Sequence, residues 1–173
     1  MIIILAALSL LGPNQAKPGA TPVAAERSFA ITLRAPMAQA CEAFGPVAEK
    51  QWSPHWQPEF ISWTGSETNP ETAVFTTPMH ASDRLLWVMT AHDCKSGLVQ
   101  YVNVEPGSVV TVLEIRCARL GKNETRAIVR ARKTALSPAG SEFVRRFAEH
   151  FALEGPHWEQ AINGYLAAAK AGQ

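Results

Sequence analysis

The sequence predicts one α+β domain in which a curved antiparallel sheet packs around a long C-terminal helix. Two observations carry this prediction. Large apolar residues recur at intervals of four and seven between Pro138 and Ala169, which is typical of one face of a long helix. The chain from Phe29 to Leu136 is mostly strand-like, with apolar and polar residues alternating in several segments. Because a helix with one apolar face needs a partner surface, we expect the sheet to wrap around it.

The N-terminal part of the domain is expected to form one strand and two short helices. Residues 27–35 alternate apolar and polar side chains, as a half-buried strand does, and Pro36 ends the alternation. Proline suits the first turn of a helix, so residues 36–44 are predicted to form a short helix that ends at Gly45. A second short helical piece is expected over residues 47–52.

Six further strands are expected before the C-terminal helix. Runs of branched and aromatic residues between turn-forming segments indicate them. The predicted strands are residues 60–64, 73–77, 84–93, 98–105, 109–120 and 123–136. Together with the first strand they make a seven-stranded sheet. On the inward face of the last strand, the small residues Ala127 and Ala131 leave room for the helix or for a ligand.

The C-terminal helix has a clear start signal and one internal break signal. Ser137 is a plausible N-cap and Pro138 suits the first helical position. Pro156 lacks a backbone donor and crowds the carbonyl of Ala152, so we expect a kink between Phe151 and Trp158. The kink either widens a cavity or follows the curvature of the sheet, and we favour the second interpretation.

The charge of the chain argues against a strongly charged partner. Sixteen basic and fifteen acidic side chains give a net charge of +1, so we expect no nucleic-acid partner and no general attraction to an anionic membrane. A group of basic residues on the last two strands is interpreted as a solvated outer face, because no aromatic residues interleave it. This group contains Arg116, Arg119, Arg126, Arg130, Arg132 and Lys133.

The cysteines and histidines predict neither a disulfide nor a metal site. Three widely spaced cysteines form no disulfide framework and no metal motif, and Cys117 is expected to be a buried free thiol. The close ligand-type groupings are His80 with Asp83, and His92 with Asp93 and Cys94. Alternation along a strand places neighbours on opposite faces, so His92 and Asp93 are not expected to share an ion. No cofactor is predicted.

The first 25 residues are predicted to lie outside the domain, which then covers residues 26–173. Residues 1–12 form an apolar run that resembles a secretory signal and is too short to span a bilayer, although no Lys or Arg precedes it. Residues 14–16 or 23–25 provide small-residue cleavage patterns. Secretion or periplasmic export is therefore slightly favoured; the alternative is a disordered or misassigned leader on a cytoplasmic protein.

One segment is distinctive beyond its periodicity. Glu49 precedes the tryptophan loop, defined as residues 52–56, which reads Trp-Ser-Pro-His-Trp. With the order of elements, this loop resembles the START-like, or Bet v 1-like, superfamily (SRPBCC), and within it bacterial members related to polyketide cyclases and lipid-transport proteins. His55 stands where that group usually has glycine. The resemblance implies a helix-grip fold with a hydrophobic cavity, in a superfamily that includes carriers, cyclases and protein partners.

Candidate functional residues fall into two sets. Glu49 and His55 are weak candidates for an acid and a base, because a carboxyl group and an imidazole near two indoles are able to orient a carbonyl and move a proton. The alternative is that the tryptophans only cap the core while both titratable groups face solvent. Apolar candidates for ligand contact, which alternatively are ordinary core, are Trp52, Trp56, Trp87, Met89, Leu113, Ile115, Val129, Phe147, Phe151, Trp158 and Ile162.

Three functional hypotheses follow. The first is non-enzymatic binding of a small hydrophobic molecule, such as a lipid or a polyketide-like compound. The second is a cyclase or dehydratase that uses Glu49 or His55. The third is a protein-interaction module without a ligand. An internal cavity distinguishes the first two from the third.

Overall fold

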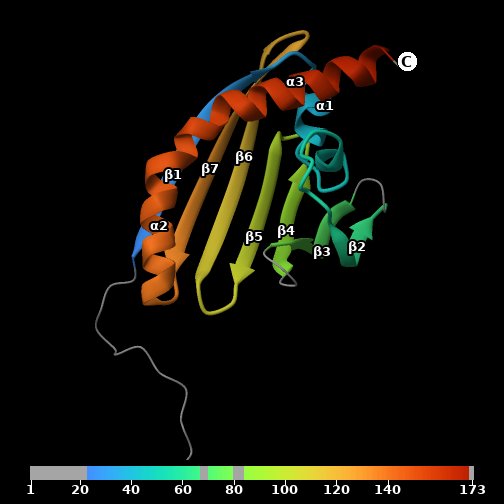
Figure 1. Ribbon diagram of the computed structural model, residues 1–173. Helices are drawn as coiled ribbons and strands as arrows, with labels where there is room; N and C mark the ends of the chain where they lie inside the picture. Colours follow the sequence, from blue (N-terminus) through green and yellow to red (C-terminus); the bar gives the residue numbers. More distant parts are fainter. Residues whose placement is uncertain (1–22, 67–69, 80–83, 172–173) are drawn as a thin grey trace, which may run out of the picture.

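In the part of the chain that the structure describes, seven antiparallel strands form one curved sheet in the order β1-β7-β6-β5-β4-β3-β2 (Figure 1). The computed structural model describes residues 23–66, 70–79 and 84–171. The strands are β1 (Ala24–Leu33), β2 (Glu59–Gly65), β3 (Pro70–Pro78), β4 (Arg84–Asp93), β5 (Leu98–Glu105), β6 (Val109–Gly121) and β7 (Glu124–Ala135). After β1 the chain crosses to the far edge and returns strand by strand, so that β7 pairs with β1. The predicted seven-stranded sheet is confirmed.

Two short helical pieces connect β1 to β2, as predicted. They are the α-helix α1 (Met37–Glu42) and the 3-10 helix η1 (Ala48–Gln51). The tryptophan loop follows η1, and its backbone is held by hydrogen bonds from the amides of Trp52 and Ser53 to the carbonyl of Glu49, at 3.2 and 2.9 Å. The connection is therefore anchored rather than open.

The predicted C-terminal helix is present but broken into three pieces. They are α2 (Pro138–His150), the 3-10 helix η2 (Phe151–Glu154) and α3 (Gly155–Ala171). Ser137 caps α2 by accepting a hydrogen bond from the amide of Gly140 at 3.1 Å. The break lies directly before Pro156, where proline removes a donor from the helical ladder.

The two helical arms cover different parts of the sheet (Figure 1). α2 runs along β1 and β7, and α3 continues across the end of the sheet, in contact with β1. At the break, Gly155 is so close to Phe29 that an added Cβ would lie 3.3 Å from its ring. The bend therefore keeps the helix against the sheet where the sheet turns.

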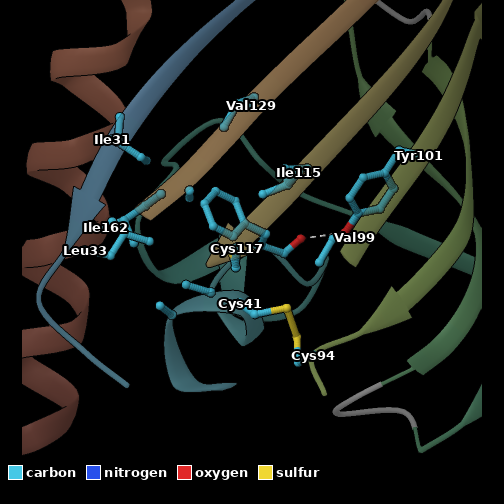
Figure 2. Close-up of a cluster of buried hydrophobic side chains, with 14 of the residues drawn as sticks. Ile31, Leu33, Cys41, Cys94, Val99, Tyr101, Ile115, Cys117, Val129 and Ile162 are labelled. Carbon is cyan, nitrogen blue, oxygen red and sulfur yellow. Dashed lines mark hydrogen bonds between the residues drawn. A yellow bond between two sulfur atoms is a disulfide. The ribbon is translucent and has the colours of Figure 1, made fainter. Parts of the chain in front are cut away.

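The core fills the part of the concave face nearest α1 (Figure 2). Ile115, Val129 and Ile162 are almost completely buried there, and Cys117 is the buried free thiol that the sequence predicted. Burial raises the pKa of the Cys117 thiol to about 12. This end of the fold is solid apolar packing.

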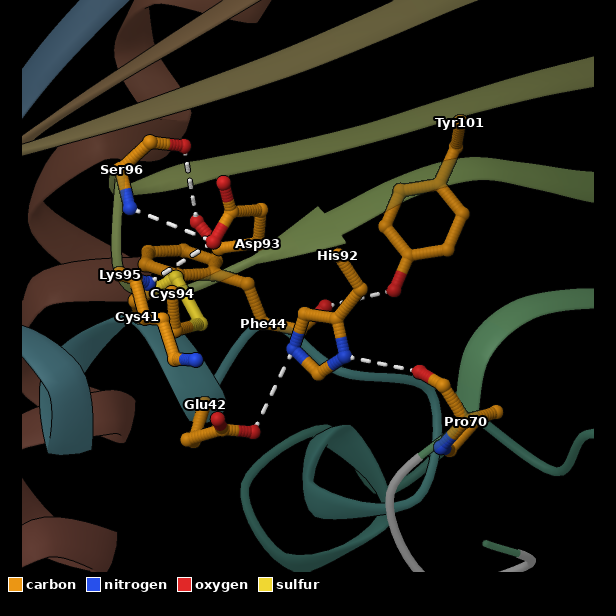
Figure 3. Close-up of a disulfide and its surroundings, with 10 residues drawn as sticks. All are labelled: Cys41, Glu42, Phe44, Pro70, His92, Asp93, Cys94, Lys95, Ser96 and Tyr101. Carbon is orange, nitrogen blue, oxygen red and sulfur yellow. Dashed lines mark hydrogen bonds and ion pairs between the residues drawn. A yellow bond between two sulfur atoms is a disulfide. The ribbon is translucent and has the colours of Figure 1, made fainter. Parts of the chain in front are cut away.

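A disulfide joins Cys41 of α1 to Cys94 after β4, which corrects the expectation that no bridge forms (Figure 3). The two Cα atoms are 5.5 Å apart and the sulfur atoms 2.09 Å apart. The pair is 53 residues apart in sequence, and it meets only because α1 folds back over the end of β4. That approach is a product of the topology and leaves no local sequence signal.

The sheet begins slightly earlier than the predicted domain boundary at residue 26. Ala24 already pairs with Thr134, and the carbonyl of Val23 accepts a hydrogen bond from Ala135 at 2.8 Å. The later of the two predicted cleavage patterns, residues 23–25, therefore coincides with the start of β1, whereas residues 1–22 lie outside the described part of the chain. Within the described residues, no helix has the length and apolarity needed to cross a membrane.

Candidate ligand cavity

A cavity of about 290 Å³ lies between the inner face of the sheet, η1 with the tryptophan loop, and the C-terminal helices. Strands β4 to β7 supply one side of it, and η2 and α3 supply residues on either side of the helix break. The lining residues are Glu49, Trp56, Trp87, Tyr101, Asn103, Thr111, Leu113, Ala131, Lys133, Phe151 and Trp158.

Two indole rings from the sheet and the tryptophan loop form part of the apolar wall. The rings of Trp56 and Trp87 lie 5.1 Å apart, edge to face. The Trp56 indole N–H donates to the carbonyl of Pro46 at 2.8 Å, and that of Trp87 donates to Oγ1 of Thr77 at 2.9 Å. Because the protein satisfies both donors, these rings present apolar surface to the cavity.

The helical wall is also aromatic and is held by rings behind it. Phe151 and Trp158 pack against Phe29, with centroids 5.1 and 5.5 Å away. The ring of Trp52 lies 5.4 Å from that of Trp158, and its N–H donates to the carbonyl of Ala43 at 2.7 Å. Trp52 therefore supports the wall from outside the cavity.

A row of polar side chains crosses the floor. Asn103, Thr111 and Lys133 are direct partners on β5, β6 and β7, so they point to the same face of the sheet. Nζ of Lys133 donates to Oγ1 of Thr111 at 2.8 Å. The Asn103 side chain is buried and makes no hydrogen bond with any described residue. Its amide is available to a bound molecule.

Lys133 is a cation in mostly apolar surroundings. Its Nζ lies 5.2 and 5.3 Å from the ring centroids of Phe143 and Phe147. Burial lowers the pKa of Lys133 to about 8, against the opposing effect of the Glu105 carboxylate. The side chain is therefore largely protonated at neutral pH, and among the described residues it has no carboxylate in salt-bridge contact.

Glu49 supplies a carboxyl group from η1. Burial raises the pKa of Glu49 from its ordinary 4.5 to about 8, and no described residue forms a hydrogen bond with its side chain. At neutral pH this carboxyl is mostly protonated, so it is able both to donate and to accept. The nearby Tyr101 hydroxyl donates to the carbonyl of Phe44 at 2.6 Å, and burial together with Glu49 raises the pKa of this phenol.

Solved structures share this arrangement of sheet and helix, whereas no protein-family model and no curated protein sequence matches the chain. Norcoclaurine synthase from Thalictrum flavum matches with a TM-score of 0.62 and 14% identity, over 96% of this chain and 98% of that chain. The Zhui aromatase/cyclase from Streptomyces sp. R1128 matches with a TM-score of 0.60 and 15% identity, over 82% and 92%. Ara h 8.0201 matches with a TM-score of 0.59 and 14% identity, over 84% and 99%.

The chain has the Bet v 1-like helix-grip fold. The resemblance inferred from the order of elements and the tryptophan loop is thereby confirmed at the level of the fold. Because these identities are low, the similarity establishes the architecture and leaves the function to be argued from the cavity.

Some of the predicted contact residues line the cavity of this helix-grip fold and others do not. Those that line it are Trp56, Trp87, Leu113, Phe151 and Trp158, and Glu49 joins them. Those that do not are Trp52, Met89, Ile115, Val129, Phe147 and Ile162. The inward face is longer than the cavity, and four of the residues outside it, Met89, Ile115, Val129 and Ile162, belong to the filled core.

His55 also lies apart from the cavity. Its side chain is exposed, whereas Trp56 next to it turns inward onto Trp87. The two candidate titratable groups of the tryptophan-loop region are therefore separated by the structure. Of the two, only Glu49 lines the cavity.

Sequence reasoning missed the polar floor. The basic group on the last two strands predicts an outer position for Lys133, but this residue is two and four residues after Ala131 and Val129, both of which face inward. On β5 the inward residues are Val99, Tyr101 and Asn103. Alternation alone would have identified Lys133 as inward, since every second residue of a strand shares a face.

Proposed function

We propose that this protein binds a small, mostly apolar molecule that carries at least one polar group. The observation that carries this proposal is the coexistence, in one aromatic cavity, of Lys133 and two polar side chains, Glu49 and Asn103, that form no side-chain hydrogen bond with any described residue. Buried polar groups normally have hydrogen-bond partners. A bound molecule with a polar group would supply them, whereas a packing void in an interaction module would not.

The size and charge of the cavity restrict the ligand class. A volume of about 290 Å³ lies at the lower end of the range for small-molecule sites, so the ligand is small. Burial of its apolar surface contributes about 25 cal/mol per Å², and the polar floor sets its orientation. At neutral pH the cavity offers a cation at Lys133 and a mostly neutral acid at Glu49, which favours a carbonyl or carboxylate oxygen near the lysine. Lipid-like and polyketide-like compounds both fall within this class.

A structural neighbour supports an aromatic ligand. A structure of the Thalictrum flavum norcoclaurine synthase, in complex with dopamine and hydroxybenzaldehyde, has a TM-score of 0.60 to this chain at 12% identity. Both compounds are small aromatic molecules with polar substituents. The same fold therefore accommodates the chemical class that we propose.

Native mass spectrometry of the protein purified from its host should reveal a co-purified compound, which tests this function. Replacing Ala131 by leucine should reduce binding at least tenfold, because three added carbons enter the cavity floor. Binding of the neutral fluorescent probe N-phenyl-1-naphthylamine gives a second readout through its affinity for each variant.

The matched control is Ala118→Leu, which makes the same chemical change at an exposed position on β6. That variant should bind the probe like the wild type. Equal loss in both variants, or no loss in Ala131→Leu with the fold preserved by circular dichroism, would show that the ligand does not occupy this cavity.

Acid–base catalysis is the second candidate, and one specific observation favours it. Glu49 and Lys133 line the same cavity, and the pKa of each is shifted to about 8. Groups with a pKa near the working pH are the effective proton donors and acceptors. A cyclase or dehydratase would use Glu49 as the acid and the neutral fraction of Lys133 as the base.

Turnover of the co-purified compound, followed by mass spectrometry, tests this candidate. An enzyme should lose at least 100-fold in rate in both Glu49→Gln and Lys133→Met. The control His55→Ala should keep the wild-type rate, because His55 is exposed and outside the cavity. A wild-type protein that releases its compound unchanged is a carrier.

We propose separately that the protein is exported from the cytoplasm. Disulfides persist mainly in oxidising compartments, so the Cys41–Cys94 bond supports secretion or periplasmic export. N-terminal sequencing of the protein from its host measures whether a leader is removed.

A further inference from the structure

His92 lies at the end of β4, outside the ligand cavity, in an unusual environment (Figure 3). Its side chain is 2% exposed, and Nδ1 lies 3.0 Å from the carbonyl oxygen of Pro70. A carbonyl oxygen only accepts, so Nδ1 must be the donor of this hydrogen bond. In the neutral ring, the lone pair of Nε2 is then left pointing the other way.

That second nitrogen faces another acceptor. Nε2 of His92 lies 3.4 Å from Oε2 of Glu42, yet it has no hydrogen-bond partner among the described residues. The contact has the distance of an ion pair without the geometry of a hydrogen bond. A lone pair and a carboxylate oxygen that converge in this way need a proton or a metal cation between them.

The sulfur atoms of the disulfide lie close to the side chains of His92 and Glu42. Ligand atoms of Glu42, His92 and Cys94 all lie within 4.8 Å of one another, and Cys41 is bonded to Cys94. The four residues come as two short pairs. Cys41 and Glu42 are adjacent on α1, whereas His92 and Cys94 are two residues apart at the end of β4, with the Asp93 side chain turned away to the amides of Lys95 and Ser96.

We propose that the reduced protein binds a thiolate-preferring divalent cation such as Zn²⁺ through Cys41, Cys94, His92 and Glu42. A dithiol reduces the bridge by exchange, which gives two cysteine thiols and the cyclic disulfide of the reductant. Cation binding then displaces one proton from each thiol. A small-molecule disulfide re-forms the Cys41–Cys94 bond by exchange, is itself reduced to two thiolates, and the cation is released.

The surroundings fit such a site. Zinc binds sulfur, nitrogen and oxygen at about 2.0–2.3 Å in a tetrahedron, so its ligand atoms are about 3.3–3.8 Å apart. The ligand atoms of Glu42, His92 and Cys94 are within 4.8 Å of one another, so side-chain shifts bring them to that spacing, and the Cys41 sulfur separates from that of Cys94 once the bond is reduced. The Pro70 carbonyl orients the imidazole, as outer-shell acceptors do for metal-bound histidines. Gly45 makes room for the ring, because an added Cβ would lie 3.0 Å from its Cε1 atom.

The cation has a route to the site. A surface pocket is lined by Glu42, His92 and Cys94, together with Glu71 from β3. Glu42 is partly exposed, with 43% of its side chain accessible. The ligand set therefore lies beneath an open surface, and the proposal is independent of the ligand cavity.

The test uses Co²⁺ as a spectroscopic probe on the full chain. The protein is reduced with a phosphine under argon and titrated with Co²⁺. We expect one equivalent to bind, with visible bands of tetrahedral cobalt and a near-ultraviolet thiolate charge-transfer band, both abolished by added Zn²⁺. The disulfide-bonded protein should show neither band.

His92→Ala should weaken binding at least tenfold and change the visible bands, whereas two control variants should bind like the wild type. The controls are Cys117→Ala, which removes a thiol outside the site, and His150→Ala, which removes an exposed histidine. Dependence on His92 supports the proposal whether the reduced chain is folded before or after the cation binds.

Three results would overturn the proposal. The first is a reduced chain that stays folded by circular dichroism and shows no cobalt bands. The second is binding that is unaffected by His92→Ala, because an unfolded chain is able to hold cobalt through any two thiols. The third is binding that is lost in Cys117→Ala.

Discussion

Removing the Cys41–Cys94 disulfide should lower the free energy of unfolding by about 4 kcal/mol. The bond closes a loop with a sequence separation of 53 residues, and chain entropy for a loop of that length gives about 4 kcal/mol at 25 °C. Urea unfolding of the double variant Cys41→Ala, Cys94→Ala, compared with the oxidised wild type, measures the loss. Since domains of this size are stable by about 5–15 kcal/mol, the variant should still be folded, with about 1–11 kcal/mol of stability left.

Cys117→Ala is the matched control for this prediction. It also removes a buried sulfur atom, but it leaves the bridge intact, so its cost should be about 1 kcal/mol. A double variant that loses no more than this control would show that the bridge constrains the chain little. The comparison also measures how much folding energy remains in the reduced form that is proposed to bind a cation.

Replacing Glu49 by glutamine should stabilise the protein by roughly 2–3 kcal/mol at pH 7, and the gain should disappear near pH 4. The pKa of Glu49 is raised from 4.5 to about 8 in the folded state. Between these values the unfolded chain releases the proton and the folded chain keeps it, so wild-type stability falls as the pH rises, by up to about 1.4 kcal/mol per unit. Glutamine has no proton to lose and avoids this penalty.

Urea unfolding of both proteins from pH 4 to pH 7.5 measures this difference. The lowered pKa of Lys133 acts in another window, because its unfolded form holds an extra proton only between about pH 8 and 10.5. Glu124→Gln, at an exposed position, should leave stability unchanged throughout. A difference between Glu49→Gln and the wild type that does not vary with pH would mean that this carboxyl ionises normally in the folded protein.

The Glu49 carboxyl affects both the stability of the free protein and the binding of a ligand. A partly buried carboxyl that forms no hydrogen bond with the described residues costs stability in the free protein, and a ligand that forms a hydrogen bond with it removes part of that cost. Polar groups that contradict the surrounding apolar pattern are expected mainly at functional sites. Glu49, Asn103 and Lys133 are such groups in this cavity.

Periodicity was sufficient for the architecture of this chain. Alternation in residues 27–35 predicted the first strand, runs of branched and aromatic residues between turns predicted the other six, and the spacing of apolar residues after Ser137 predicted the C-terminal helix. Pro156 predicted the break in that helix, because a missing backbone donor acts locally wherever it occurs. Each of these signals depends on neighbouring residues only.

Strand alternation predicts the inward position of Lys133, whereas it does not predict that of Asn103. Lys133 lies two residues after Ala131, whose side chain faces inward. Strand alternation is therefore sufficient to predict that the Lys133 side chain faces inward as well. Asn103 required the pairing of β5 with β6, because alternation along residues 98–105 separates two faces without showing which of them meets the cavity. Strand alternation shows which side chains share a face, but tertiary packing decides which of the two faces lies inside.

By itself, the sequence determined the order of the elements, the sheet and the helix that covers it, because these follow from local periodicity and turn chemistry. The tertiary structure alone decided the contacts between distant segments. It joined Cys41 to Cys94, turned His92 toward Glu42, and left a cavity beside the packed core on the concave face. The physical reason is that a disulfide, an ion pair and a cavity depend on distances in space that residue spacing along the chain does not encode.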